Sequence, residues 1–510
     1  MKVMLMVPPE KHYMVASTHK ALDHKREARP LLGILSVATY LKNRRPDVEL
    51  KFIDCRAEGL TFEDIAQTIR EFQPDLVGLT CLTFSYYDTL HTARIIKESC
   101  QTAKVCVGGW HVTLYPQETL NQKDVDYVVF GEGEKTFLEL VDAVSQGRHP
   151  EGVLGLGYKL QSTSKMNSRW LDGGSPQVTG KPVMNEYTVR HGGDHQQIKQ
   201  VMLNHERPVE ENLDDIDSPD FSLVDINRYS HILDRGFDVT LPMESSRGCP
   251  FTCIFCDIRK TRFRSRSPEF IATEMERWAA KGVRSFFFVD DNLTANKPRA
   301  IQLFKEIVRR NLNVEFKVSS RIDRLDDEVM LWMKRAGVSR VSVGIESSKQ
   351  KYLDLMQKKI TVEQIEDCLA RARKIDLPVF AFMMLGLPGQ TRQEMLEEVD
   401  FLKKNKVEYA SFSVLTLYPK TEMHRIALAN GVLKEDPWQS FAENPVPEMQ
   451  APYANGLYSG EELKKIQLEV TRRFYFSPRI LYRRIREVNS FKALKQRAKL
   501  ALRLLGIEGA

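Results

Sequence analysis

Short apolar runs alternate with helical patterns over the first 145 residues. Five runs rich in β-branched residues predict buried parallel strands: KVMLMV, LKFIDC, DLVGLTC, KVCVGG and YVVFGEG. Two stretches between them repeat apolar residues along one helix face: Ile34, Val37, Ala38 and Leu41, then Phe62, Ile65, Ile69 and Phe72. Thr61 stands where the N-cap of the second helix is expected. This alternation predicts a doubly wound parallel sheet, which binds ligands beyond the carboxyl ends of its strands.

A second set of alternating elements begins near residue 238, after a polar stretch with weak periodicity. Six apolar runs, each followed by a helical pattern, predict a (β/α)6 barrel or partial barrel. Ser267-Pro268-Glu269 is a typical helix start. The predicted organisation is a sheet domain at 1–150, a linker with one or two strands and an irregular insertion at 151–235, a barrel at 236–435 and a helical basic region at 436–510.

Composition narrows the class of protein. Hydrophobic residues make up 42% of the chain and charged residues 28%, as in a globular protein. The N-terminal apolar run is too short for a secretory signal, and no stretch approaches the roughly 20 apolar residues of a membrane span. We therefore expect a cytoplasmic protein. The net charge of +6 belongs to the tail at 471–510, which holds eight Arg and three Lys against two Glu, so it does not indicate nucleic-acid binding by the body.

Three of the eight cysteines are clustered. Cys249, Cys253 and Cys256 have the spacing Cys-x₃-Cys-x₂-Cys. Three thiolates can hold a four-iron cluster and leave one iron open. A zinc-stabilised binding module is the alternative, but zinc needs a fourth ligand, and no His lies between Cys256 and His424. The other five cysteines are expected to be buried small hydrophobes: Cys55, Cys81, Cys100, Cys106 and Cys368.

This cysteine pattern, placed after the first strand of a repeating βα barrel, resembles the signature of the radical S-adenosylmethionine superfamily. The resemblance implies that Cys249, Cys253 and Cys256 hold a [4Fe–4S] cluster whose open iron binds S-adenosylmethionine. Reductive cleavage of S-adenosylmethionine then gives a 5′-deoxyadenosyl radical that abstracts hydrogen from an unactivated carbon. The chemistry belongs to the cofactor, and the protein supplies orientation and seclusion.

The same resemblance implies contacts to S-adenosylmethionine at the ends of four later strands. They are Asp290 and Asp291 for the methionyl amine, Ser320 and Arg321 for the carboxylate, Glu346 for a ribose hydroxyl, and Gly386 and Pro388 beside the adenosyl part. Two of these motifs have a structural alternative. Asp-Asp-Asn is often a helix cap, and Gly-x-Pro-Gly is often a turn.

A doubly wound domain ahead of such a barrel resembles the cobalamin-binding class of radical enzymes. The resemblance covers most of residues 1–435 and implies a cobalamin site at these positions: Thr80, Leu82, Gly108, Gly109, His111, Gly131, Glu132 and Gly133. Glycines permit the close backbone approach that a corrin needs. Histidine ligation of cobalt uses Asp-x-His-x-x-Gly, and the nearest match, at Glu10 to Val15, departs from it at both ends. We therefore do not expect His12 to bind cobalt, and we expect His111 to position the Gly108-Gly109 loop.

Methyl transfer to an unactivated carbon is the function that these resemblances favour. The alternative within the same chemistry is oxidative ring formation, as in the anaerobic magnesium-protoporphyrin monomethyl ester cyclase branch. A third hypothesis is a radical enzyme without cobalamin, in which the sheet domain only docks a partner. The expected partners are a small-molecule or lipid-like substrate and an external electron donor of the flavodoxin or ferredoxin type. The basic tail either packs on the barrel or lies on an anionic membrane surface.

Overall fold

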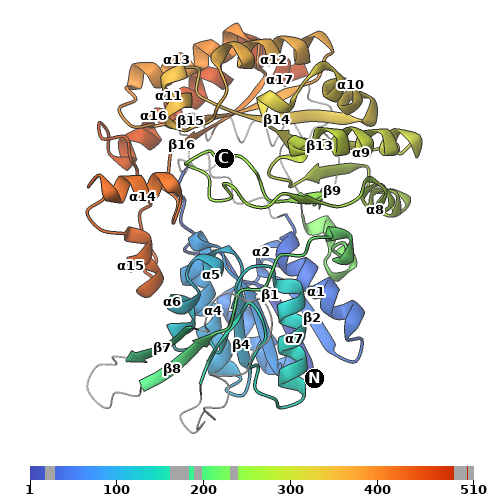
Figure 1. Ribbon diagram of the computed structural model, residues 1–510, viewed down its shortest axis with the longest axis vertical. Coiled ribbons are helices and arrows are strands. Elements are labelled where there is room, and N and C mark those ends of the chain that lie inside the picture. The colour runs from blue at the N-terminus through green and yellow to red at the C-terminus, as the bar shows by residue number, and fades with distance from the viewer. Residues whose placement is uncertain (18–28, 161–182, 189–197, 230–238, 487–501, 503–510) are drawn as a thin grey trace, which may run out of the picture.

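The computed structural model describes residues 1–17, 29–160, 183–188, 198–229, 239–486 and 502. Figure 1 shows two α/β units, with the N-terminal sheet at the bottom of the view and the barrel at the top. The fold class predicted from the sequence is confirmed in both units.

The N-terminal unit is an eight-stranded sheet with the order β2-β1-β3-β4-β5-β6-β8-β7. Its strands are β1 (Lys2–Val7), β2 (Glu49–Asp54), β3 (Leu76–Thr80), β4 (Lys104–Gly108), β5 (Tyr127–Val129), β6 (Leu156–Lys159), β7 (Val183–Thr188) and β8 (Ile198–Leu203). The first five strands pair in parallel, and β6, β7 and β8 continue the sheet with antiparallel pairing. The sheet therefore extends through strands that lie beyond the predicted domain boundary at residue 150.

Helices cover both faces of this sheet. They are α1 (Leu32–Arg44), α2 (Cys55–Glu58), α3 (Phe62–Phe72), α4 (Tyr86–Ser99), α5 (Trp110–Leu114), α6 (Pro116–Asn121) and α7 (Gly133–Ser145). One face packs Leu5 against residues of α1 and α7, and the opposite face packs Met4 against residues of α3 and α4. The predicted cap of α3 is confirmed, because Thr61 and Asp64 form a capping box.

The second unit is a six-stranded, all-parallel sheet with the order β16-β15-β14-β13-β12-β9. Its strands are β9 (Thr240–Met243), β12 (Ser285–Phe288), β13 (Glu315–Ser320), β14 (Val338–Glu346), β15 (Val379–Leu385) and β16 (Tyr409–Val414). The strands β9 and β16 are its two edges, so the predicted (β/α)6 barrel is a partial, open one. A two-stranded ladder, β10 (Ser246–Arg247) with β11 (Arg264–Ser265), stands beside it.

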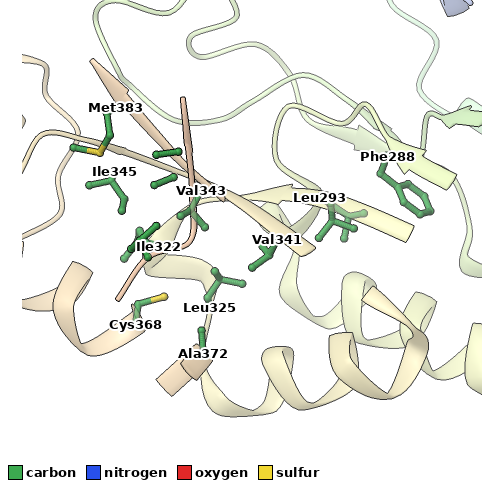
Figure 2. Packing of buried hydrophobic residues seen from close by; sticks show 14 of the residues in the cluster. Phe288, Leu293, Ile322, Leu325, Val341, Val343, Ile345, Cys368, Ala372 and Met383 are labelled. Carbon is green, nitrogen blue, oxygen red and sulfur yellow. The ribbon is translucent and has the colours of Figure 1, made fainter. Parts of the chain in front are cut away.

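The helices of the barrel lie outside its strands. They are α8 (Pro268–Ala280), α9 (Lys297–Arg309), α10 (Asp327–Ala336), α11 (Gln350–Leu355), α12 (Val362–Lys374), α13 (Arg392–Lys404) and α14 (Glu422–Ala429). Helix α8 begins where the sequence predicts, and the Ser267 hydroxyl accepts a hydrogen bond from the Phe270 N–H (3.1 Å). Figure 2 shows the core between strands and helices, where Val341 and Ile345 of β14 pack near Cys368 and Ala372 of α12. The five cysteines expected to be buried are buried.

The C-terminal helices are α15 (Pro437–Glu443), α16 (Gly460–Tyr475) and α17 (Pro478–Arg486), and the last two pack against the barrel. The Tyr475 hydroxyl donates to the Ala410 carbonyl (2.7 Å), and the Gln467 amide donates to the Phe412 carbonyl (2.5 Å). These bonds satisfy backbone groups along the free edge of β16, which would otherwise offer an open ladder. Arg484 of α17 stacks over Tyr409 at 3.8 Å and donates to the Glu408 carbonyl. The described part of the basic tail thus packs on the barrel.

Helix α15 joins the two units. It places Trp438 and Phe441 in the core of the N-terminal unit, and Figure 1 shows α14 and α15 reaching down towards α6.

Short 3₁₀ turns lie at Thr83–Ser85, Leu213–Asp215, Phe221–Leu223, Ile226–Arg228, Leu293–Ala295 and Ile322–Arg324. Among the described residues, none of the helices has both the length and the apolar character needed to cross a membrane. The tail from residue 487 onward, apart from residue 502, lies outside the described residues.

Candidate functional site

A cavity of about 250 Å³ lies at the carboxyl ends of β3, β4 and β5, under the first turns of α1 and α7. Six of the eight residues predicted for cobalamin line it: Thr80, Gly108, Gly109, Gly131, Glu132 and Gly133. Its remaining wall is mainly apolar, with side chains such as Ile34 and Val37 of α1 and Phe137 of α7. A deep, mostly apolar slot with polar groups at its rim suits the tail of a large cofactor.

Backbone geometry shapes this cavity. Gly109 has φ 109°, and a Cβ at this position would lie 2.6 Å from the Cys81 carbonyl oxygen. The ends of β3 and β4 can therefore meet only if residue 109 is glycine. A Cβ at Gly33 or Gly131 would meet no atom within 4 Å, so both positions face open space. The cavity thus fits a ligand that approaches the backbone closely, as the glycine pattern predicts for a corrin.

Leu82 and His111 are not among the residues that line the cavity. His111 is fully buried with its ring 3.9 Å from that of Tyr86, and its Nδ1 lies 3.2 Å from the Thr83 hydroxyl. Burial lowers the pKa of His111 to about 3, so the ring is neutral. His111 therefore supports the loop after Gly109 from within the core, which agrees with the positioning role expected for it.

His12 lies in the loop after β1. Its Nδ1 is 2.8 Å from a carboxylate oxygen of Asp88, and its backbone N–H donates to the other oxygen (2.7 Å). Asp88 is fully buried. His12 does not line the cavity. This position agrees with the expectation that His12 is not a cobalt ligand, which stays a prediction.

The three clustered cysteines occupy one loop between β10 and β11, at the mouth of the barrel. The loop starts with a tight turn, because Gly248 has φ 85° and a Cβ there would lie 2.3 Å from the Arg262 carbonyl oxygen. Cys253 is buried, while Cys249 and Cys256 are half-buried. Burial raises the pKa of Cys249 and raises that of Cys256 to about 12, and Cys253 adds to both shifts. Binding of iron would therefore displace the protons of these thiols.

This arrangement differs from that of a single-ion site. Across the described ranges, no three side chains of His, Cys, Asp or Glu converge closely enough to hold one metal ion. A zinc ion needs its ligands within roughly 2.0–2.3 Å of one point. An iron–sulfur cube instead binds each thiolate at a separate corner, so three thiols on one loop can hold it without converging on one point.

The two predicted aspartates at the end of β12 have different surroundings. Asp290 is buried and accepts hydrogen bonds from the N–H (3.2 Å) and hydroxyl (2.8 Å) of Ser245 and from the Ser246 hydroxyl. It therefore fixes the chain just ahead of the cluster loop. Asp291 is exposed. Partial desolvation, with the charges of Asp290 and Asp257, raises the pKa of Asp291 to about 6. Asp291 is the aspartate available to an incoming cation.

Ser320 and Arg321 lie where β13 ends. The Arg321 guanidinium donates to the Cys253 sulfur (3.4 Å) and to the Lys358 carbonyl (2.7 Å), and it stacks over Phe251 at 4.2 Å. The Ser320 hydroxyl pairs with that of Thr294 (2.6 Å). Arg321 therefore contacts the cluster loop through Cys253 and Phe251, and the sequence did not predict these contacts.

Glu346 ends β14 with φ 67°, an uncommon conformation for a residue other than glycine. Its carboxylate forms a buried ion pair with Lys358 (2.7 Å). Lys358 therefore compensates the charge of this buried acid, and the contact of Glu346 with a ribose hydroxyl stays a prediction. Such strained backbone is often found at functional sites.

Gly386 and Pro388 form the turn after β15. A Cβ at Gly386 would lie 3.0 Å from Leu463 of α16, so the close approach here is to a helix. The Asn455 amide donates to the Leu387 and Gln390 carbonyls (2.8 and 2.9 Å) and fixes the turn. A role beside the adenosyl group stays a prediction.

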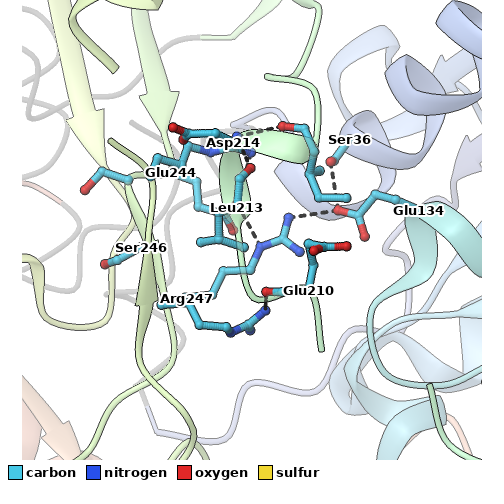
Figure 3. A network of polar contacts seen from close by, with 12 residues as sticks. Ser36, Glu134, Glu210, Leu213, Asp214, Glu244, Ser246 and Arg247 are labelled. Atoms are coloured by element: carbon cyan, nitrogen blue, oxygen red, sulfur yellow. Dashed lines mark hydrogen bonds and ion pairs between the residues drawn. The ribbon is translucent and has the colours of Figure 1, made fainter. Parts of the chain in front are cut away.

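A network of charged residues that the sequence did not predict joins the two sites. Arg247 pairs with Glu132 (3.1 Å), Glu134 (2.8 Å) and Glu244 (2.9 Å). Figure 3 shows Arg247 between Glu134 of the N-terminal unit and Glu244 of the barrel. Arg247 and Glu244 also line the cavity. The sequence offered only one signal for this contact, the position of Arg247 two residues before Cys249.

A glycine-walled cavity in a doubly wound sheet, facing a three-thiol loop on a partial barrel, defines a protein with two adjoining cofactor sites. The family model of the radical SAM superfamily matches residues 243–402, and that of the B12 binding domain matches residues 29–141. The uncharacterized methyltransferase PH0819 of Pyrococcus horikoshii is 32% identical over 498 residues, which cover 96% of each chain. This chain therefore belongs to the radical SAM enzymes that carry a B12-binding domain.

Two other comparisons agree with this assignment. The anaerobic magnesium-protoporphyrin IX monomethyl ester cyclase of Cereibacter sphaeroides is 26% identical over 77% of this chain and 58% of its own length. The radical S-adenosylmethionine methyltransferase TsrM of Kitasatospora setae, solved with cobalamin and a [4Fe–4S] cluster, has the same fold (TM-score 0.66, 17% identity, 99% of each chain). The predicted family and its cofactors, a [4Fe–4S] cluster, S-adenosylmethionine and cobalamin, are confirmed.

Proposed function

We propose that this chain is a cobalamin-dependent radical methyltransferase that acts on an unactivated carbon of a small molecule. The observation that carries the proposal is the shared wall of the two sites, because Arg247 lines the glycine cavity and stands two residues before Cys249. A relative that matches almost the whole chain is named a methyltransferase. When bound, the cluster with S-adenosylmethionine supplies the radical, and cobalamin supplies a carrier for the methyl group.

The chain's own residues have distinct tasks in this proposal. Cys249, Cys253 and Cys256 hold the cluster. Asp291 accepts the ammonium group of S-adenosylmethionine, and Glu346, oriented by Lys358, accepts a ribose hydroxyl. Six of the residues predicted for cobalamin line the cavity. Their backbone holds that cofactor and excludes water from it.

Labelled S-adenosylmethionine tests the transfer without a known substrate. The protein is reconstituted anaerobically with iron, sulfide and hydroxocobalamin, reduced with titanium(III) citrate and given S-adenosylmethionine with a deuterated methyl group. We expect labelled methylcobalamin, and separately 5′-deoxyadenosine. A preparation that forms 5′-deoxyadenosine and binds cobalamin, yet transfers no label to it, contradicts methyl transfer.

That same result would support the second candidate, an oxidative cyclase. The match to the magnesium-protoporphyrin cyclase over 77% of this chain is the observation that favours it. Magnesium-protoporphyrin monomethyl ester is then the substrate to test. A third outcome, cluster loading with no retention of corrinoid, would support a B12-like domain that only docks a partner.

We also propose an external donor of the flavodoxin or ferredoxin type and a contact between the basic tail and a membrane surface. Leu481 and Tyr482 of α17 are exposed beside Arg479 and Arg486, a combination typical of interfacial helices. Co-sedimentation with vesicles containing phosphatidylglycerol tests this contact. We expect the full chain to pellet more than a chain that ends at residue 477, which lacks α17 and the residues after it, and equal pelleting would exclude the contact.

A further inference from the structure

The loop that holds the three cysteines is closed by a small hairpin. Strands β10 and β11 pair antiparallel, with Ser246 opposite Ser265 and Arg247 opposite Arg264. Residues 248–263, which include all three clustered cysteines, lie between these strands. Any shift of the hairpin therefore moves the cluster loop.

Both arginines of the hairpin form ion pairs with the rim of the cavity in the other unit, which consists of Glu132 and Glu134. Arg264 donates to both carboxylate oxygens of Glu132 (2.8 and 3.1 Å) and to the Glu210 carbonyl (2.7 Å). Arg247 pairs with Glu132 and Glu134 on the same rim. The Glu210 N–H donates back to Glu132 (3.0 Å), so the segment between the two units joins the contact.

The carboxylates on this rim are held firmly from their own side as well. Glu134 is buried and accepts a hydrogen bond from the Ser36 hydroxyl of α1 (2.8 Å), which Figure 3 shows beside Arg247. Burial works against a charge on Glu132, but the hydrogen bonds from Arg264 and the charge of Arg247 outweigh it, so the pKa of Glu132 is lowered. Ion pairs with little solvent exposure fix one geometry, because breaking one leaves an uncompensated charge.

We propose that Arg264 and Arg247 form a clamp that couples cobalamin occupancy of the cavity to the position of the cluster loop. The proposal rests on the assignment of cobalamin to this cavity. Glu132 and Glu134 line the cavity, so a bound ligand fixes the rim that the two arginines hold. Arg264 itself does not line the cavity, and it is therefore a positioning residue that acts through Glu132.

The variant Arg264→Gln tests the clamp because it leaves every cavity-lining residue in place. The probe is hydroxocobalamin, added to the anaerobically reconstituted [4Fe–4S] protein. We expect its affinity to fall about tenfold, within the usual range of coupling between two sites. In the parent protein, hydroxocobalamin should slow amide hydrogen exchange in residues 248–263, and this protection should be lost in the variant.

Two further variants keep the test falsifiable. Arg264→Lys keeps the charge but cannot bind both oxygens of Glu132 as a fork, so it should give an intermediate affinity even if the glutamine variant unfolds. Arg309→Gln removes an exposed arginine paired with Glu306 and should leave both readouts unchanged. Parent-like affinity and protection in the Arg264 variants would overturn the clamp, whereas a parent protein that binds no hydroxocobalamin would overturn the cavity assignment itself.

Discussion

The cavity of the N-terminal unit is walled mostly by backbone and apolar side chains, with charged residues at its rim, whereas charged side chains surround the cluster loop at the mouth of the barrel. Around the cavity, the ends of β3 and β4 approach so closely that Gly109 has no room for a Cβ. At the barrel mouth, Arg321 contacts a cluster cysteine, and a Glu346–Lys358 pair is buried nearby. The first site selects its ligand by shape, and the second controls the charge around its ligand.

This difference predicts which substitutions each site tolerates. A shape-selecting site should lose binding when one methyl group is added to its wall, with little change in the chemistry of the other site. A site built from charges should keep its shape after a conservative substitution but change its potential or its pH dependence. The following variants test this contrast, from the largest expected effect to the smallest.

Replacing a cluster ligand should have the largest effect, because it removes the iron–sulfur cluster while the cobalamin cavity stays in place. Cys253→Ala removes the buried thiol of the loop, and we expect loss of the cluster and no detectable 5′-deoxyadenosine. Iron and sulfide analysis with product chromatography measures both. Hydroxocobalamin should still bind, because the cavity wall contains none of the three clustered cysteines, with a loss of affinity no larger than the roughly tenfold coupling through the clamp.

The matched control for this loss is Cys368→Ala, which removes a buried cysteine of α12. It should keep the iron content of the parent. An intact cluster in the Cys253 variant would contradict the assignment of the loop as the cluster site.

Adding one methyl group to the cavity wall should have the next largest effect. Gly109→Ala places a Cβ 2.6 Å from the Cys81 carbonyl oxygen and imposes a φ of 109° on alanine. Strain of this kind costs on the order of 1–3 kcal/mol, so hydroxocobalamin affinity should fall about tenfold or more while iron content is unchanged. Absorbance after equilibrium dialysis measures the affinity.

A control for backbone strain alone is available in the same unit. Gly59 also has a positive φ, 69°, but a Cβ there meets no atom within 4 Å. Gly59→Ala should cost some stability and leave the affinity for hydroxocobalamin unchanged. Equal losses in the two variants would mean that general destabilisation, and not the cavity wall, lowers binding.

At the charged site, Arg321→Gln should change the reduction potential of the cluster. The guanidinium donates to the Cys253 sulfur (3.4 Å), and a charged donor stabilises the more negative, reduced cluster. We expect the midpoint potential to fall by about 60 mV, equivalent to a tenfold change in a one-electron equilibrium. A redox titration followed by electron paramagnetic resonance measures it.

Arg324→Gln is the matched control, because Arg324 also lies over Phe251, at 5.3 Å, without a hydrogen bond to the sulfur in the structure. Its potential should stay near that of the parent. The same shift in both variants would show that the potential responds to general positive charge and not to the hydrogen bond.

The sequence predicted motifs better than it predicted the partners of those motifs. The cysteine spacing, the six βα units and most of the glycine loops are local patterns, and the structure contains each of them. Arg247 and Glu134 are 113 residues apart, and no local pattern reveals that they meet. The same holds for Lys358, which has no motif of its own. The resemblance also implies a place for His111 at the cobalamin site, but the ring is buried in the core and does not line the cavity.

The strands β6, β7 and β8 show a second reason for incomplete prediction. They lie in a polar stretch with weak alternation. Because β6 pairs with β5, β8 with β6 and β7 with β8, successive pairing from the edge of the parallel sheet defines them better than their own pattern does. Helix α16 covers the free edge of β16 in a similar way, through side-chain contacts that periodicity does not encode. Edges of sheets depend on long-range contacts.

The smallest expected effect concerns the stability cost of keeping Asp291 charged. The pKa of Asp291 is raised from 3.8 to about 6, so its ionisation opposes folding at any pH above about 6, and this cost disappears below the unfolded value. In the cofactor-free protein, Asp291→Asn should raise Tm by about 1–2 °C near pH 8, because solvent screens the exposed carboxylate, and by less near pH 5. Scanning calorimetry at the two pH values measures the difference.

The control is Asp376→Asn, at a carboxylate whose side chain is 90% exposed, and it should change Tm at neither pH. If Asp291→Asn instead lowers Tm near pH 8, the Asp291 carboxylate stabilises the fold. That result would exclude the idea that this charge is kept for a ligand at a cost in stability.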